Sequence, residues 1–160
     1  MAKCTFVRAV RTGSLTIIIC FLAVLLVLAG VGLYTEYCGS PLDWKDAQLS
    51  LGESERFTEQ ERAEALSATL EYMMDNFTDC KLLKLSCGKY DHPKYDEELE
   101  YVNDLGSHHG KHYTKWIRTW GTVEHLKDNG AGRRKGEQWE YYFYVASEQD
   151  GKWEVVTFGY

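Results

Sequence analysis

The chain has 160 residues, of which 24 are acidic and 18 are Lys or Arg, so its formal net charge is −6 at pH 7. Three of the basic residues and none of the acidic ones precede residue 15, which leaves residues 35–160 with a net charge of −9. Binding to a phosphate backbone depends on clustered cations, so this balance argues against nucleic acid as a partner.

Residues 15–34, LTIIICFLAVLLVLAGVGLY, form an uncharged apolar run. A helix that rises about 1.5 Å per residue needs about 20 such residues to cross a hydrocarbon core of roughly 30 Å. Lys3, Arg8 and Arg11 precede the run without any acidic residue. The positive-inside rule therefore predicts a cytoplasmic tail over residues 1–14, a single-pass signal-anchor helix over residues 15–34, and export of everything that follows to the outside of the cell membrane.

Two other processing routes give the same location for residues 35–160. A cleaved secretory signal also starts with basic residues, but its apolar core is usually about 7–15 residues long. The small residues Ala29, Gly30 and Gly32 near the outer end of the run would suit a signal peptidase. Residues 28–30 also resemble the start of a bacterial lipobox, but Val31 stands where the lipidated cysteine would be.

Residues 35–55 combine Gly39, Pro41 and Gly52 with charged residues, which predicts a stalk between membrane and domain. Residues 56–160 are enough for one extracytoplasmic domain. Thr58 and Glu61 form the pattern of a capping box, which predicts the start of a long helix that ends near residue 76. Its apolar residues recur at three- and four-residue steps and predict one face packed on a sheet: Leu66, Leu70, Met73, Met74 and Phe77.

The remaining segments predict strands with one short acidic helix, at residues 94–105. Residues 80–87 alternate as a strand, residues 113–123 are rich in aromatic and β-branched residues, and Gly121 within them predicts a bulge or bend. Residues 139–145 alternate with period two, and residues 153–160 form a closing strand. The expected fold is α+β: a long helix packed on a curved antiparallel sheet, forming a cone-like domain after the transmembrane helix.

Two stretches resemble an uncharacterised family of small exported domains and lipoproteins of Gram-positive bacteria. They are residues 57–61, FTEQE, which lead through the helix into residues 77–80, FTDC, and the closing GKWEVVTFGY at residues 151–160. The resemblance covers residues 56–160 and implies a nuclear transport factor 2-like (cystatin-like) cone. The chain departs from the family at Thr157 and Phe158, where an acidic residue and a Trp are frequent, and it lacks the lipobox cysteine. The resemblance carries over no catalytic residue.

The strongest candidate for metal chemistry is the histidine-rich stretch that contains His108, His109 and His112. Imidazole binds zinc and copper, and His108 and His112 would share one face of a helix. Gly106 and Gly110 favour a loop instead, and no Cys or Glu completes a known ligand spacing. We therefore expect a solvated polar loop, with no metal and no other cofactor.

Cys38, Cys80 and Cys87 follow the apolar run, so at least one of them is unpaired within the chain. On one extended strand Cys80 and Cys87 would be about 23 Å apart and would point to opposite faces, whereas bridged Cα atoms lie within about 7 Å. We therefore predict no bridge between them. Cys38 is expected to stay free or to pair between chains.

Two functions fit this reading. The first is a membrane-anchored, non-enzymatic extracytoplasmic domain that binds a protein or a small-molecule ligand, since the sequence has no nucleophile–base or phosphate-loop motif. The second is a small-molecule enzyme that uses the aromatic pocket of the cone, with a buried carboxylate or histidine facing an open cavity. The sequence assigns no catalytic residue.

Overall fold

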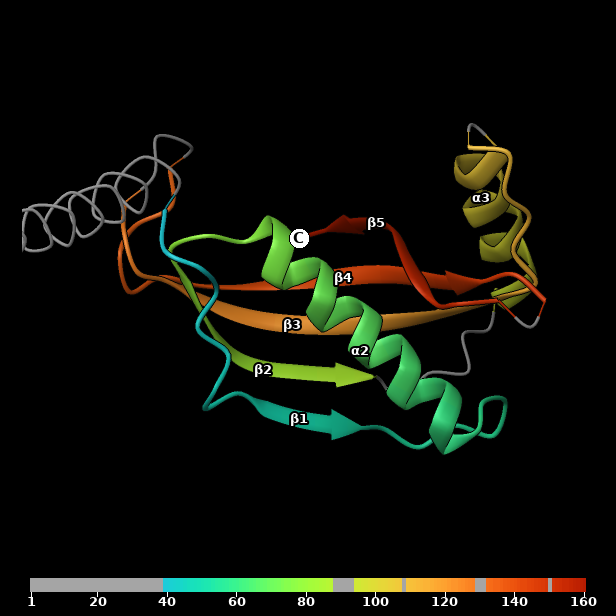
Figure 1. Cartoon of the computed structure of the whole chain (residues 1–160), viewed down its shortest axis with the longest axis horizontal. Coiled ribbons are helices and arrows are strands. Elements are labelled where there is room, and N and C mark those ends of the chain that lie inside the picture. Colours follow the sequence, from blue (N-terminus) through green and yellow to red (C-terminus); the bar gives the residue numbers. More distant parts are fainter. Residues whose placement is uncertain (1–38, 88–93, 108, 129–131, 150) are drawn as a thin grey trace, which may run out of the picture. The chain divides into compact units, whose positions relative to one another are not determined.

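The computed structural model describes residues 39–87, 94–107, 109–128, 132–149 and 151–160. Within them, residues 41–160 form one compact unit in which helix α2 lies obliquely across one face of a five-stranded sheet (Figure 1). The elements are β1 (Gln48–Leu51), α2 (Glu59–Asn76), β2 (Cys80–Cys87), α3 (Tyr95–Ser107), β3 (Lys115–His125), β4 (Gln138–Ser147) and β5 (Glu154–Gly159). The α+β class is confirmed.

The sheet is mixed, and its strands follow one another in chain order from β1 to β5. Strands β2 to β5 are antiparallel, as predicted, but β1 runs parallel to β2, with Leu49 opposite Leu85. The prediction of a wholly antiparallel sheet was wrong. The predicted stalk also missed this strand, and the domain begins before residue 56, because Leu42 is buried and Pro41 forms a bridge with Thr78.

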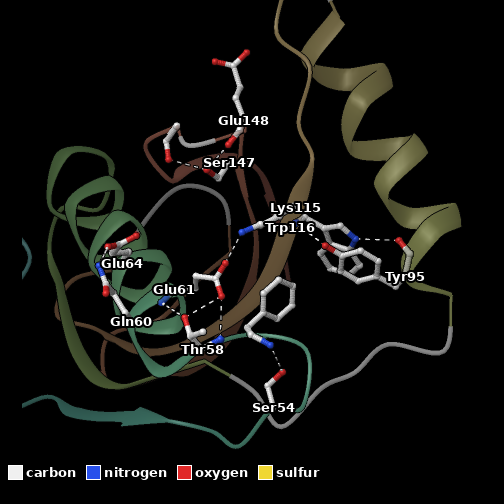
Figure 2. Close-up of polar contacts among 12 residues, drawn as sticks. Ser54, Thr58, Gln60, Glu61, Glu64, Tyr95, Lys115, Trp116, Ser147 and Glu148 are labelled. Carbon is white, nitrogen blue, oxygen red and sulfur yellow. Dashed lines mark hydrogen bonds and ion pairs between the residues drawn. The ribbon is translucent and has the colours of Figure 1, made fainter.

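Helix α2 begins where its capping residues predict. The Thr58 Oγ1 atom accepts a hydrogen bond of 3.2 Å from the Glu61 amide, and a Glu61 carboxylate oxygen accepts one of 2.9 Å from the Thr58 amide (Figure 2). The same carboxylate pairs with Lys115 of β3 at 2.5 Å. The Lys115 hydrogen bond is the main cause that lowers the pKa of Glu61. The cap therefore fixes both the start of the helix and its attachment to the sheet.

The buried face of α2 passes very close to the sheet. Thr69 and Met73 are fully buried, whereas Met74, expected on the packed face, is exposed. A Cβ atom on Gly121 would lie 3.2 Å from the Met73 sulfur, so glycine at this position lets the helix approach. The pairing of β3 with both neighbours is in register at Gly121, so the predicted bulge does not occur at this residue.

A bulge occurs instead in β2, between Leu82 and Lys84. The extra residue changes the alternation, so Cys80 and Cys87 lie on the same face, opposite His125 and Thr119 of β3. Both cysteines are buried and free. The prediction of no bridge is confirmed, but the argument from opposite faces was wrong. Cys38 lies outside the described residues.

Helix α3 packs against the other face of the sheet, beside the start of β3. The Trp116 indole N–H donates to the Tyr95 carbonyl at 3.0 Å, and the two rings stack with centroids 5.3 Å apart (Figure 2). Arg118 pairs with Glu98 at 2.7 Å. These contacts confirm the predicted short helix and leave the face under α2 as the main core.

The predicted transmembrane helix at residues 15–34 and the cytoplasmic tail at residues 1–14 lie outside the described residues. Among the residues that the structure describes, no helix is long and apolar enough to span a bilayer.

Candidate ligand-binding pocket

An open pocket of ≈ 540 Å³ lies where the end of α2 meets the sheet. This volume is within the range of about 300–1,000 Å³ that is typical of small-molecule sites. Its lining comes from α2 and the segment after it, from β2 to β5, from the segment between β3 and β4, and from the residue after β5: Tyr72, Asn76, Phe77, Thr78, Cys80, His125, Arg133, Tyr141, Phe158 and Tyr160. Five of the ten are aromatic rings from distant parts of the sequence.

Contacts between these rings hold the apolar wall of the pocket in place. Phe77 meets Tyr141 edge-on with centroids 5.1 Å apart, and Phe158 stacks on Phe143 at 5.8 Å. Tyr72 contacts Phe158 from the helix side at 5.7 Å. Such tilted and offset pairs are each worth about 0.5–1.5 kcal/mol beyond the area that they bury. The aromatic wall is therefore a preformed part of the fold.

A cysteine–histidine pair forms part of the polar floor. Cys80 and His125 are direct neighbours across β2 and β3, and the Cys80 Sγ atom lies 3.4 Å from His125 Nδ1. Burial raises the pKa of the Cys80 thiol, and burial, followed by the charge of Arg133, lowers the pKa of His125. Both shifts favour the uncharged forms, so the pair is a thiol and a neutral imidazole at pH 7. It lacks the thiolate of an activated cysteine nucleophile.

Two buried polar atoms at the pocket have no hydrogen-bond partner among the described residues: His125 Nε2 and the Tyr141 hydroxyl. The exposed fraction is 5% for His125 and 1% for Tyr141. A buried polar group without a partner costs about 1–3 kcal/mol, so such groups are rare and require an explanation. Both atoms are enclosed by the surrounding side chains, so the open space of the pocket does not reach them in this arrangement.

Arg133 brings a positive charge to the same place. Its guanidinium carbon lies 5.1 Å from the ring centroid of Trp139, 5.5 Å from that of Tyr141 and 5.6 Å from that of Tyr160. Cation–π attraction therefore holds the guanidinium over the rings. Burial raises the pKa of the Tyr141 hydroxyl, and the charge of Arg133 opposes that rise.

A second pocket of ≈ 500 Å³ contains a polar cluster between the end of α3 and β5. The Lys111 ammonium lies 2.5 Å from both oxygens of Glu154, and the Tyr113 hydroxyl donates to the same carboxylate at 2.8 Å. The cluster resembles catalytic machinery in composition, but its groups satisfy one another. We interpret it as a link between the loop after α3 and β5.

The predicted metal candidates gain no support from the structure. His109 lines the second pocket, His112 is exposed, and His108 lies outside the described residues. In the described part of the chain, no group of three or more His, Cys, Asp or Glu residues is placed to hold a metal ion.

Sequence reasoning missed His125, because its place on the buried face of β3 is seen only in the structure. Every second residue of β3 from Ile117 to His125 is buried, so His125 falls on the apolar face. A histidine in that position belongs to the interior of the domain and therefore needs partners there.

Comparisons with protein-family models, with curated proteins and with solved structures returned no match.

Proposed function

We propose that this chain is a membrane-anchored extracytoplasmic domain that binds a small ligand in the pocket beside His125 and does not transform it. The observation that carries the proposal is the open pocket of ≈ 540 Å³ itself, which combines a preformed aromatic wall with the polar side chains of Cys80 and His125. A binding site requires an apolar body with a few polar groups that fix orientation. A neutral thiol beside a neutral imidazole suits binding better than nucleophilic chemistry.

A pocket-blocking variant tests binding in the full chain, reconstituted in nanodiscs. Thr78 is an exposed residue of the pocket lining, so Thr78→Trp would fill the space. Thr114→Trp is the matched control, because Thr114 is also an exposed threonine and is not part of this lining. Compounds from a fragment library should bind the unmodified chain and the control and should fail to bind Thr78→Trp. If the compounds bind all three proteins equally, the pocket is not the binding site.

The second candidate function is a small-molecule enzyme, and the contact between Cys80 and His125 favours it. The two functions differ in what Cys80→Ala would change. In an enzyme this variant would bind ligand and lose turnover, whereas in a binding module no turnover exists to be lost. Incubation of the unmodified chain with bound compounds, followed by mass analysis of those compounds, decides between them.

The location is proposed on the sequence alone. The apolar run at residues 15–34 and the three cations before it support a cytoplasmic N-terminus and an exported domain. Protease added outside intact cells should digest the domain and spare residues 1–14, which mass spectrometry of the membrane fraction would detect. A soluble exported form that starts near Val31 would show that the run is a cleaved signal.

The family is likewise a proposal. The two stretches at residues 57–80 and 151–160 resemble the exported nuclear transport factor 2-like domains described above. Helix α2 lies across a sheet whose strand register shifts in β2 and again where β4 pairs with β5. Such irregularities bend a sheet, which supports a cone-like shape. An experimental structure whose pocket is closed by the sheet itself would support the relationship, and a flat sheet would count against it.

A further inference from the structure

We propose that the domain docks on the outer surface of the membrane through one end, which we call the anchor end, and that its partner there is the layer of lipid headgroups. The anchor end consists of residues 41–44, 78–80, 126–128 and 132–139, together with Tyr160. Part of this end also lines the pocket beside His125, so docking brings that pocket to the membrane surface. The proposal rests on the membrane anchor of the proposed function. Three features support it: the place where the chain enters the domain, the exposed aromatic side chains, and the distribution of charge.

The chain enters the domain at this end. Pro41 forms an antiparallel bridge with Thr78, and the Asp79 carbonyl accepts a hydrogen bond of 2.7 Å from the Leu126 amide just after β3. Residues 35–40 separate Pro41 from the end of the apolar run, and even a fully extended chain of this length spans at most about 25 Å. With the run in the bilayer, the anchor end therefore stays within about 25 Å of the hydrocarbon core.

Helix α3 and the start of α2 form the opposite end of the domain, which we call the far end. Helix α3 packs on Trp116 near the start of β3, and the cap of α2 pairs with Lys115 at the same place (Figure 1). Strand β3 has 11 residues, so at about 3.4 Å per residue it separates the two ends by roughly 34 Å. The length of the connecting chain therefore restrains the anchor end and leaves the far end free to point away from the bilayer.

Exposed aromatic side chains of the anchor end suit the membrane interface. Tyr160 is 74% exposed, and its ring centroid lies 5.4 Å from that of Trp139. The Arg133 guanidinium packs over both rings. Trp44, which follows the bridge between Asp43 and β2, is 38% exposed. Trp and Tyr are enriched at the level of the headgroups, because each ring has an apolar body and a polar tip, and arginine side chains can reach the same layer.

The distribution of charge favours the same orientation. The described residues between β3 and β4 include two acids and four cations: Lys127, Arg133, Arg134 and Lys135. Asp79, which pairs with Lys127 at 2.9 Å, adds a third acid, so this part of the anchor end is close to neutral. Helix α3 has five acids, of which only two pair with a cation, Arg118 or Lys94. Screening acts within about 8–10 Å, so the two ends behave independently, and a negatively charged membrane repels the far end alone.

The test measures which end of the domain contacts lipid, in the full chain reconstituted in phosphatidylcholine nanodiscs. A fluorescent maleimide label is attached to Gln138→Cys at the anchor end or to Gln60→Cys at the far end, and both residues are exposed glutamines. Alanine replaces Cys4, Cys20 and Cys38, while Cys80 and Cys87 are buried. Lipids that carry a nitroxide on the headgroup should quench most of the fluorescence of the label at residue 138 and none of that at residue 60.

Two tyrosine variants test the aromatic contact. Tyr160→Ser should reduce the quenching of the label at residue 138, because it removes the most exposed ring of the anchor end. Tyr101→Ser is the matched control, since Tyr101 is an exposed tyrosine of α3 at the far end, and it should leave the quenching unchanged. Addition of phosphatidylglycerol to the nanodiscs should not weaken the quenching at residue 138, because the anchor end carries no large negative charge.

Equal quenching of the two labels, or quenching of neither, would overturn the docking, as would equal effects of the two tyrosine variants or release of the label by phosphatidylglycerol. Protection of the label at residue 138 from iodide in water, without quenching by the lipids, would indicate a protein partner at the anchor end and would also overturn it. If the membrane fraction of cells contains the intact N-terminus but the label is not quenched, the anchor stands and the docking fails. An exported form that starts near Val31 would remove the anchor and the docking together.

Discussion

The two buried threonines that join α2 to β3 should contribute unequally to stability, although they share one hydrogen bond. Thr69 Oγ1 lies 2.9 Å from the Ala65 carbonyl and 2.8 Å from Thr119 Oγ1. A carbonyl only accepts, so the single Thr69 proton goes to Ala65, and Thr119 must donate to Thr69. Both residues are fully buried, so neither hydroxyl can turn to water.

The direction of the hydrogen bond from Thr119 to Thr69 sets the expected cost of each substitution. Thr69→Val leaves the Thr119 hydroxyl proton buried without an acceptor, at a cost of about 1–3 kcal/mol. Thr119→Val removes one hydrogen bond but leaves the Thr69 proton on Ala65, at a cost of about 0.5–1.5 kcal/mol. Valine has nearly the same shape as threonine, so no cavity adds to either value. The double variant should be less destabilised than the sum of the single ones, because it leaves no donor unpaired.

Urea unfolding followed by tryptophan fluorescence measures these differences in the full chain in detergent. All five tryptophans lie in residues 41–160, so the signal reports this domain alone. Thr114→Val is the control, because Thr114 is exposed and the change should stay within about 0.5 kcal/mol. The assigned direction is refuted if Thr119→Val costs more than Thr69→Val, or if the two costs simply add in the double variant.

Three further predictions concern other parts of the domain. Burial would raise the pKa of Glu154, but hydrogen bonds, chiefly from Lys111, hold this pKa below its usual value. The ionised carboxylate therefore stabilises the fold above the unfolded pKa, and this stabilisation is lost as pH falls through the folded pKa. Glu154→Gln should cost about 0.2–1 kcal/mol at pH 7 and flatten the acid side of a plot of melting temperature against pH. Gly106→Ala should destabilise by about 1–3 kcal/mol in urea unfolding, since its Cβ would lie 2.5 Å from the ring of Tyr113, and a neutral result would mean that this ring moves freely. Burial raises the pKa of Cys87 to about 11, so peptide mapping should find it unmodified by iodoacetamide at pH 8 until urea unfolds the chain, and rapid labelling of the native form would contradict its burial.

Local sequence signals predicted the elements whose own residues carry a periodic pattern. Thr58 and Glu61 marked the start of α2, and the alternation of β4 placed Tyr141 and Phe143 on the buried face. Strand β1 was missed because it has only four residues, and the short alternation of QLSL between Gly39 and Gly52 does not distinguish it from a linker. Strand β1 forms by pairing with β2, so its register follows from a strand that is distant in the sequence.

The candidate site was less predictable because it depends on strand register. Cys80 and His125 are 45 residues apart, and no sequence spacing relates them. Their contact follows from how β2 pairs with β3, and the bulge beyond Leu82 keeps both cysteines of β2 on the core face. A bulge has no unambiguous sequence signature, so an aromatic pocket could be expected from the sequence, but its polar floor could not.

The short strand β1 is an edge with a particular liability. Four residues pair it to the sheet, all of them exposed, so its amides should exchange with deuterated solvent sooner than those of β3. Leu49 and Leu51 of β1 line a groove with Leu66 and Leu85, both of which are buried. Release of β1 would uncover these leucines and the free backbone edge of β2 at the same time. Self-association of the domain should therefore begin at this edge, and it should increase with any change that weakens the β1–β2 pairing.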